Sequence, residues 1–257
     1  MSSTHPRILG PRTVGVIPAR LASTRLPRKV LRTLAGEPML AWVYRAAKEC
    51  PQLDEVIVAT DSTEVQQLCE ERGWRCLLTS PDLPSGTDRL YAVSRVVDAD
   101  IYVNIQGDEP LLLPDHISAI LALFTSPAID VTTPKVRCTA EDITNPNAVK
   151  VVTAIDDRAL YFSRAAIPFD RDGQGKTTYW KHLGLYAYRR AALERFAALA
   201  PSELELSERL EQLRLLESGI SIYVAETAHD TIGVDTEDDL QRVEAILLKR
   251  GESKPSR

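Results

Sequence analysis

A cluster of cationic side chains follows the first apolar segment of the chain. Residues 14–17 (VGVI) form a short apolar run that predicts a buried strand, and IPARLASTRLPRK continues from it. The cations of this loop are Arg20, Arg25, Arg28 and Lys29. Such a group repels itself unless an anion is bound, and arginine and lysine are the side chains that bind phosphate well. The GxxxxGK[ST] spacing of a Walker loop is absent. Either this is a solvated basic loop or, as its place after a strand favours, it binds a polyphosphate.

Two aspartates stand where a metal ligand would be useful. In NIQGDEP a predicted strand ends at Gln106 and Gly107, and Asp108 follows at its tip. In GVDTEDDL, Asp235 precedes the last predicted helix. Each has an ordinary alternative, a turn for Asp108 and a helix N-cap neighbourhood for Asp235. One or two carboxylates plus substrate phosphates are, however, the usual ligands of Mg²⁺.

Two later motifs carry further polar candidates. His182 in KHLGLYAYRR is either a substrate contact or a satisfied core histidine. In ELSERLEQLRLLESG a single helix is predicted over residues 205–217. Glu211 and its neighbour Gln212 could point together toward a ligand, although intrahelical ion pairs explain the charges of this segment equally well.

The elements that must position these residues alternate between strand and helix. Strands are predicted at residues 14–17, 55–60, 75–79 and 100–105, with helices that begin near residues 38, 63 and 85. This alternation of apolar strands and helices predicts a parallel sheet covered on both faces. Ligands of such sheets bind beyond the carboxyl ends of the strands, where the basic loop and Asp108 are expected.

The pattern of predicted elements changes in the second part of the chain. Residues 130–190 read as strands without long helices between them, with an arm over residues 163–178. A capping box of Thr236 and Asp239 opens a final helix that runs to about Arg250. We therefore expect one α/β domain over residues 14–250 with a β-rich insertion, and flexible ends at residues 1–13 and 251–257.

Composition limits the function classes. The chain has 257 residues and a formal net charge of -5, which argues against general affinity for nucleic acid. No apolar run is long enough to span a bilayer, and the first residues lack the apolar core of a signal peptide. We expect a cytoplasmic protein without a membrane or nucleic-acid partner.

Seven motifs, taken in order, resemble those of one enzyme family. They are IPARLASTRLPRK, VNIQGDEP, NPNAVKVV, ALYFSRAAIPF, KHLGLYAYRR, LEQLR and GVDTEDDL. Together they resemble the 3-deoxy-manno-octulosonate (KDO) cytidylyltransferases, from about Val14 to Leu247. The resemblance implies a Rossmann-like mixed, mainly parallel sheet of nucleotide-diphospho-sugar transferase type, in a homodimer. It also implies that CTP and KDO react, with Mg²⁺, to give CMP-KDO and pyrophosphate for lipopolysaccharide synthesis.

The same resemblance assigns roles to individual residues. It implies nucleotide binding by Arg20, Ser23, Arg25, Lys29, Arg89 and Gln106. It implies catalytic roles for Arg20, Lys29, Asp108 and Asp235, of which the two aspartates would bind Mg²⁺. It implies a sugar pocket lined by Arg164, His182, Tyr186, Glu211 and Gln212, in which Arg164 or His182 is suited to the sugar carboxylate.

The chain departs from the family pattern at two places. Arg28 replaces the usual glycine of the basic loop, so it is strained if that position needs a positive φ; otherwise it points outward or adds a phosphate contact. Leu83 and Pro84 stand where many members have a histidine. A related acceptor such as 8-amino-KDO is therefore the alternative substrate. A nucleotide-sugar-dependent glycosyltransferase is a remote alternative, since its DxD pair is replaced by QGDEP here.

Overall fold

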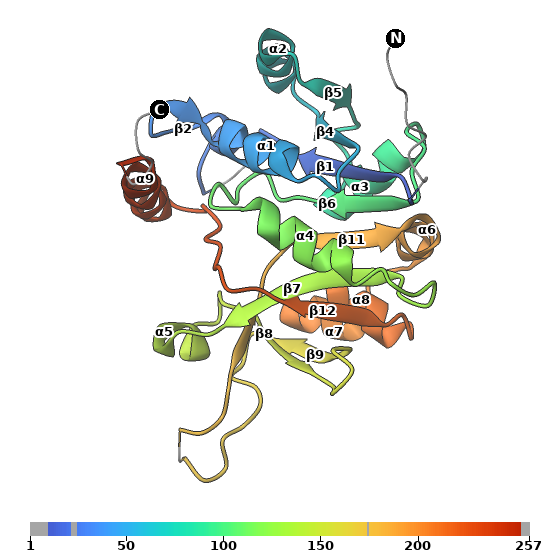
Figure 1. Ribbon diagram of the computed structural model, residues 1–257, viewed down its shortest axis with the longest axis vertical. Helices are drawn as coiled ribbons and strands as arrows, with labels where there is room; N and C mark the ends of the chain where they lie inside the picture. Colours follow the sequence, from blue (N-terminus) through green and yellow to red (C-terminus); the bar gives the residue numbers. More distant parts are fainter. Residues whose placement is uncertain (1–9, 22–24, 174, 253–257) are drawn as a thin grey trace, which may run out of the picture.

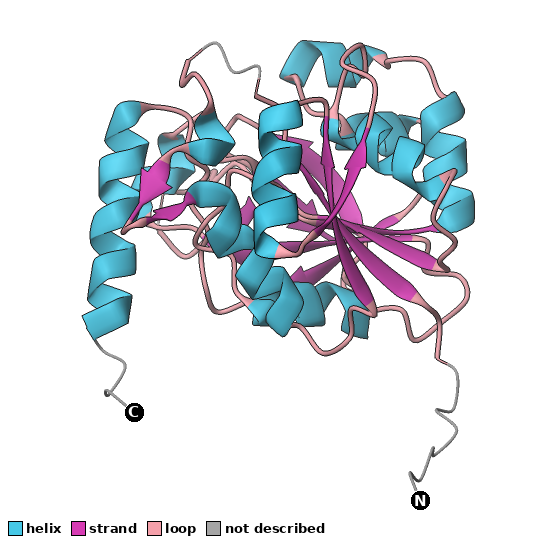
Figure 2. Cartoon of the chain, turned by 90° about the horizontal axis from the view of Figure 1, so that it is seen from above, coloured by secondary structure: helices cyan, strands magenta, loops and turns pink. Residues whose placement is uncertain are grey.

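One mixed sheet forms the centre of the molecule. The computed structural model describes residues 10–21, 25–173 and 175–252, and in them ten strands pair into a single sheet (Figure 1). The strand order is β5-β4-β1-β6-β11-β7-β10-β8-β9, with β12 paired to β7. Helices pack on both sides of the fan of strands (Figure 2). The predicted mixed α/β fold is confirmed.

The first half of the sheet is parallel, as predicted. Its strands are β1 (Thr13–Pro18), β4 (Glu55–Thr60), β5 (Arg75–Leu78) and β6 (Ile101–Asn104). The helices between them are α1 (Met39–Glu49), α2 (Thr63–Arg72) and α3 (Gly86–Ser94). A small hairpin, β2 (Thr33–Leu34) with β3 (Glu37–Pro38), precedes α1. Ser62 caps α2 by accepting the Glu64 and Val65 amides, and Gly73 ends the helix at φ 66°.

Burial on both faces explains the continuous apolar runs of these strands. Val14 and Val16 of β1 pack into one hydrophobic cluster with α3, while Ile17 packs into a second cluster with α1 and α2. Successive side chains of a strand point to opposite faces, so both parities must be apolar when helices cover both. This arrangement leaves the strand ends as the place for polar chemistry.

The predicted β-rich part is the antiparallel half of the same sheet. Its strands are β7 (Val131–Arg137), β8 (Lys150–Thr153), β9 (Ala159–Ser163), β10 (Trp180–His182) and β11 (Tyr186–Arg189). The junction is β11, which pairs antiparallel with β6 so that Tyr186 lies opposite Asn104. The segment between β9 and β10, predicted as an arm, extends away from the sheet (Figure 1). Three helices that the sequence patterns did not predict are α4 (Pro114–Ala122), α5 (Ala140–Thr144) and α6 (Arg190–Ala198).

The single helix predicted over residues 205–217 is wrong. Two short helices stand there instead, α7 (Glu203–Glu208) and α8 (Gln212–Glu217). Arg209 between them is left-handed at φ 55°. The leucines have helical spacing, but Leu206 is exposed whereas Leu210 is buried in the core. Burial of Leu210 against the sheet therefore overrides the local periodicity.

Ion pairs with other partners replace the pairs expected within that helix. Arg214 holds Glu205 through two bonds, Nε to Oε2 at 2.7 Å and one terminal nitrogen to Oε1 at 2.5 Å. Both side chains are largely buried, so this pair fixes α8 against α7. Glu208 turns to β9, where it accepts the Ser163 hydroxyl at 2.6 Å. The junction thus presents Glu211 and Gln212 at the start of α8.

The last elements return to the sheet. Strand β12 (Ile222–Glu226) pairs parallel with β7, and α9 (Glu237–Glu252) follows. Thr236 and Asp239 form the predicted capping box. The predicted flexible ends reach too far inward: the Arg12 amide donates to Asp100, β1 includes Thr13, and α9 continues to Glu252. Residues 1–9 and 253–257 lie outside the described part. No helix within that part is long and apolar enough to cross a bilayer.

Candidate active site

A cavity of about 620 Å³ opens beyond the carboxyl ends of β1 and β6. It is lined by Pro18, Arg20, Arg25, Lys29, Val30, Ser85, Gly86, Arg89, Gln106, Gly107, Asp108 and Asp235. Every described residue that was predicted to bind nucleotide or metal belongs to this lining. Ser23, which was predicted with them, lies outside the described residues. The cavity is where ligands of open α/β sheets are expected.

Parallel pairing and one glycine bring the two loops together. Val16 pairs with Asn104, and the Ile105 amide donates to the Val16 carbonyl at 2.9 Å, so β1 and β6 end side by side. A Cβ added to Gly107 would lie 2.7 Å from the Pro18 carbonyl oxygen. Only glycine fits this close backbone approach. The glycine of QGDEP therefore sets the distance between the basic loop and Asp108.

Lys29 joins the two predicted metal ligands. It opens a short 3₁₀ helix (Lys29–Leu31), and its Nζ donates to Asp108 Oδ2 at 2.5 Å and to Asp235 Oδ1 at 2.9 Å. A backbone bond from the Val234 amide to the Asp108 carbonyl, 2.9 Å long, brings the Asp235 segment to this edge. Arg25 pairs with the other oxygen of Asp235 at 2.9 Å. Residues more than 200 positions apart thus form one ionic group.

The electrostatics of this group favour its charged form. Burial alone would lower the pKa of Lys29, but the Asp108 and Asp235 carboxylates outweigh it and the pKa is raised. Burial alone would raise the pKa of Asp235, yet its bonds to Lys29 and the charge of Arg25 lower it. Lys29 and Asp235 are therefore both ionised at neutral pH.

The two carboxylates fit a hard divalent cation. They already converge on one cation, the Lys29 ammonium, through oxygen atoms that Mg²⁺ prefers as ligands. Within the described ranges, no group of three or more His, Cys, Asp or Glu side chains could form an all-protein metal cage. Asp108 and Asp235 would therefore hold Mg²⁺ together with phosphate and water oxygens, as Mg²⁺ sites commonly do.

Arg89 is held rigidly at the cavity wall. Its side chain is only 2% exposed, and it pairs with Asp61 Oδ2 at 3.1 Å and bonds the Thr79 hydroxyl. Both partners stand just beyond the ends of the neighbouring strands β4 and β5. The guanidinium is thus a fixed, charge-compensated donor, and Asp61 is a functional neighbour that sequence reasoning missed.

Several of the predicted sugar-binding residues gather beside this cavity. The Thr87 hydroxyl in the first turn of α3 donates to Glu211 Oε2 at 3.0 Å and accepts Asn104 Nδ2 at 3.4 Å. Burial raises the pKa of Glu211. Across the described structure, Asn104 Oδ1, the Tyr186 hydroxyl and Gln212 Nε2 are buried and have no hydrogen-bond partner. Buried polar atoms normally have partners, so these three remain able to bond a water molecule or a polar ligand.

His182 lies beside Tyr186 as a neutral side chain. Its ring nitrogen Nε2 lies 2.9 Å from Thr133 Oγ1, and its ring centroid lies 5.3 Å from that of Tyr186. Burial lowers the pKa of His182 to about 3, so the imidazole is uncharged at neutral pH. His182 can share a hydrogen bond with a sugar but brings no positive charge to its carboxylate, in contrast to one role expected for it.

None of the five predicted sugar-binding residues is part of the cavity lining, and Arg164 is bonded to a different part of the structure. Its guanidinium donates to the backbone carbonyls of Glu208 at 2.8 Å and Pro146 at 2.9 Å, and its amide donates to Glu208 Oε2. These bonds tie the end of β9 to the α7–α8 junction. In this structure Arg164 supports the segment that carries Glu211 rather than lining the cavity.

Sequence reasoning also missed several lining residues. Ser85 caps α3 by accepting the Asp88 amide, and Gly86 begins the helix, so the first turn of α3 faces the cavity. The signal that could have found them was the position of SGTDR at the start of a helix in a strand–helix alternation. Helix N-termini at strand ends attract anions because their amides are unpaired.

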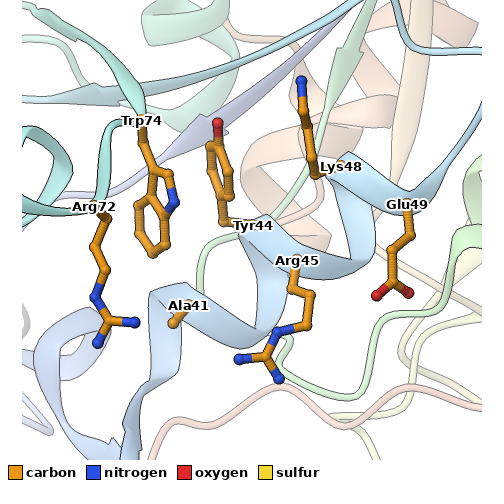
Figure 3. Close-up of a pocket in the computed structure, with 7 residues that line it drawn as sticks. All are labelled: Ala41, Tyr44, Arg45, Lys48, Glu49, Arg72 and Trp74. Atoms are coloured by element: carbon orange, nitrogen blue, oxygen red, sulfur yellow. The ribbon is translucent and has the colours of Figure 1, made fainter.

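A second hollow, of about 330 Å³, lies away from the strand ends (Figure 3). Tyr44 of α1 stacks on Trp74 with ring centroids 4.2 Å apart. Arg72 and Arg45 point to one side of this hollow (Figure 3). Arg72 donates a hydrogen bond to Glu37 at 2.7 Å, and the charges of Arg72 and Arg45 lower the pKa of Glu37. None of the predicted site residues lines this hollow, so the cavity at β1 and β6 is the candidate active site.

The fold and the site together define a nucleotidyltransferase, and comparison with known proteins narrows the class. The cytidylyltransferase family profile matches residues 14–222. A 3-deoxy-manno-octulosonate cytidylyltransferase of Acidobacterium capsulatum is 63% identical over 92% of this chain and 97% of its own length. That of Koribacter versatilis is 57% identical over 93% and 91%. The chain belongs to the 3-deoxy-manno-octulosonate cytidylyltransferase family, which confirms the resemblance seen in the motifs.

Solved structures agree with this assignment. CMP:2-keto-3-deoxy-manno-octonic acid synthetase in complex with CTP superposes with a TM-score of 0.90 at 42% identity, over 93% of this chain and 99% of that one. The inositol-1-phosphate CTP transferase of T. maritima has a TM-score of 0.67 at 12% identity, over 96% and 99%. The second likeness shows a shared fold alone.

Proposed function

We propose that this protein transfers the cytidylyl group of CTP to KDO, giving CMP-KDO and pyrophosphate. The observation that carries the proposal is the ionic group of Lys29, Asp108 and Asp235 in a cation-lined cavity at the strand ends. Relatives at 63% and 57% identity are named for this reaction, and a structural neighbour was solved with CTP. The product would supply the acidic sugar of lipopolysaccharide.

The reaction forms one bond and breaks one. The anomeric hydroxyl oxygen of KDO attacks the α-phosphorus of CTP, the bond from that phosphorus to the bridging oxygen breaks, and pyrophosphate leaves. The hydroxyl proton passes to solvent. Arg20, Arg25 and Lys29 line the cavity and would neutralise the charge that grows on the pyrophosphate. Preorganised cations of this kind are the largest contribution in most phosphoryl transfers.

Asp108 and Asp235 would hold the magnesium ion. Mg²⁺ held there would supply Lewis-acid stabilisation of the charge on the reacting phosphate. The chain's own part is to fix the two carboxylates at one edge, through the close approach at Gly107 and the Val234–Asp108 backbone bond. No general base among the side chains is needed in this scheme.

The sugar would occupy the pocket beside α3. The unpaired Tyr186 hydroxyl, Gln212 amide and Asn104 carbonyl oxygen offer hydrogen bonds to sugar hydroxyls. Glu211 adds an acceptor and His182 a neutral partner. This set would select a polyhydroxylated sugar by hydrogen bonds, so removal of one partner should weaken binding of the sugar more than binding of CTP.

We further propose a homodimer in the cytoplasm. Three apolar side chains of the β-rich half are exposed to solvent: Ile155 after β8, Leu160 in β9 at 54% and Phe169 in the arm at 85%. A second copy would bury such side chains. Sedimentation of the wild type against Phe169→Asp tests this, and a monomeric wild type would contradict it.

The function is tested by pyrophosphate release with Mg²⁺, pairing each of the four ribonucleoside triphosphates with KDO. Release with CTP and KDO together supports the proposal. Faster release with 8-amino-KDO would move the acceptor to the amino sugar, with Leu83 and Pro84 as the first positions to examine. Release of free nucleotide from a nucleotide sugar, without pyrophosphate, would favour the glycosyltransferase alternative.

A further inference from the structure

The ionic group of the cavity, formed by Lys29, Arg25, Asp108 and Asp235, has a net charge of zero. Asp108 and Asp235 carry two negative charges, and the cations within 4 Å of them, among the described residues, are Lys29 and Arg25. Lys29 contacts both carboxylates and its side chain is only 12% exposed, whereas Arg25 contacts Asp235 alone and is 65% exposed. Lys29 is thus the internal counter-ion of the metal ligands.

A divalent cation and the Lys29 ammonium need the same oxygen atoms. Nζ lies 2.5 Å from Asp108 Oδ2 and 2.9 Å from Asp235 Oδ1, so it occupies the space between the two carboxylates. A Mg²⁺ ion would bind such oxygens at about 2.0–2.1 Å. It would then lie within a few ångströms of the ammonium, and the two positive charges would repel each other strongly. Lys29 must leave before the metal ligands are free.

The cavity offers Lys29 another partner once CTP is bound. The wall that holds the carboxylates also carries Arg20, Arg25 and the first turn of α3, which together suit a triphosphate. Phosphate oxygens are strong acceptors for an ammonium, and lysine has a flexible four-carbon stem. Transfer of Nζ to a phosphate would leave Asp108 without its cation and Asp235 with Arg25 alone, beside the same polyanion.

We infer that Lys29 exchanges partners, from the two carboxylates in the empty site to the triphosphate in the loaded site, and so couples metal binding to CTP binding. This inference rests on the proposed function, since it needs a triphosphate in the cavity. The empty protein binds divalent cations weakly because Lys29 competes for their ligands. CTP removes the competitor, and by linkage the metal strengthens CTP binding by the same factor.

The test is the affinity for Mn²⁺ alone, with no CTP present, followed by the electron paramagnetic resonance signal of free Mn²⁺. Lys29→Met keeps the length of the side chain and removes the charge. We expect it to bind Mn²⁺ roughly tenfold or more tightly than the wild type, within the usual range of allosteric coupling. Arg25→Met should tighten Mn²⁺ binding less, because Arg25 contacts one carboxylate only.

A control variant that loses the same charge separates competition for the carboxylates from a general change in the electrostatic potential of the cavity. Arg20→Met removes a cation from the same cavity without freeing a carboxylate, so its Mn²⁺ affinity should stay close to that of the wild type. Adding Asp108→Asn to Lys29→Met should abolish the tightened binding. Circular dichroism confirms that each variant is folded.

The outcomes separate this inference from the proposed function. Equal Mn²⁺ affinity for the wild type and Lys29→Met, or equal tightening by Arg20→Met, would overturn the exchange of partners. The wild type would still be the proposed enzyme if it releases pyrophosphate from CTP and KDO. Absence of that release, with tightened Mn²⁺ binding by Lys29→Met, would overturn the function and leave the competition at the carboxylates intact.

Discussion

Gly107→Ala tests whether backbone contact between two loops sets the geometry of the active site. The added Cβ would lie 2.7 Å from the Pro18 carbonyl oxygen, 3.5 Å from Ile17 Cγ2 and 3.6 Å from Val30 Cγ1. An ordinary contact begins at 3.4 Å, so the loops must separate by about 0.7 Å (3.4 minus 2.7).

The expected effect has a stability part and a catalytic part. Overpacking of this size costs about 1–3 kcal/mol, or roughly 2–4 °C in Tm for each kcal/mol in a protein of this length. The displacement also moves Asp108 relative to Lys29, whose Nζ is now 2.5 Å from it. Misplacement of reacting groups by about 1 Å lowers rates by about 100-fold. We therefore expect kcat to fall by roughly 10- to 100-fold, measured by pyrophosphate release.

Gly233→Ala is the matched control. It lies two residues before Asp235, and no atom lies within 4 Å of its added Cβ. Its unfolding free energy should change by no more than about 0.5 kcal/mol and its kcat should be near normal. If Gly107→Ala kept a kcat within twofold of the wild type and an unchanged Tm, the reasoning that this close approach positions Asp108 would be refuted.

Three further predictions concern single side chains. Asp108→Asn should lower kcat by roughly 1,000-fold while circular dichroism and Tm stay close to wild type, and near-normal pyrophosphate release would exclude Asp108 as a metal ligand. Arg28 adopts φ 57°, and its exposed guanidinium pairs with Glu64. Both Arg28→Gly and Arg28→Ala remove this ion pair, but glycine alone relieves the strain of a positive φ, so Arg28→Gly should be more stable to urea by up to about 1 kcal/mol. Equal stabilities of the two variants would contradict the strain. The pKa of His182 is about 3 in the folded protein against an ordinary value of 6.5, so the unfolded chain binds the extra proton between these values. The stability that comes from burying a neutral His182 is therefore fully present above pH 6.5. As the pH falls from 6.5 toward 3, the free energy of unfolding decreases by up to about 1.4 kcal/mol per pH unit. Unfolding free energies between about pH 5 and 7 should show a shallower pH dependence for His182→Gln, and an unchanged slope would disprove the neutral burial.

The fold could be predicted where local signals and burial agree. The strand predicted at residues 55–60 matches the structure residue for residue, and the helix predicted to begin near residue 63 begins at Thr63. An apolar run marks the strand, and a serine cap and a C-terminal glycine mark the ends of the helix. The prediction failed at residues 205–217, where Arg209 turns left-handed and divides the helix. Leucine spacing there is helical, but only contacts made across the whole fold decide which leucine is buried.

The site could be predicted for a topological reason. Parallel strands point their carboxyl ends to one edge, so the loop after β1 and the residues after β6 had to meet. Arg164 had no such constraint: it follows an antiparallel strand, and its guanidinium binds the carbonyls of Glu208 and Pro146. Asp61 could not be assigned either, since nothing near it in sequence shows that it pairs with Arg89.

The sequence by itself determined the α/β class, the family, and the residue types expected to bind phosphate and metal. Apolar periodicity, caps and cation clusters are local, and local patterns follow from the order of residues along the chain. The tertiary structure decided which charges neutralise one another. Lys29 meets Asp235 across 206 positions and Glu211 meets Thr87 across 124, and such distances close only when strands pair and helices pack. Burial in that packing also makes His182 neutral and leaves the Tyr186 hydroxyl and Gln212 Nε2 without hydrogen-bond partners among the described residues.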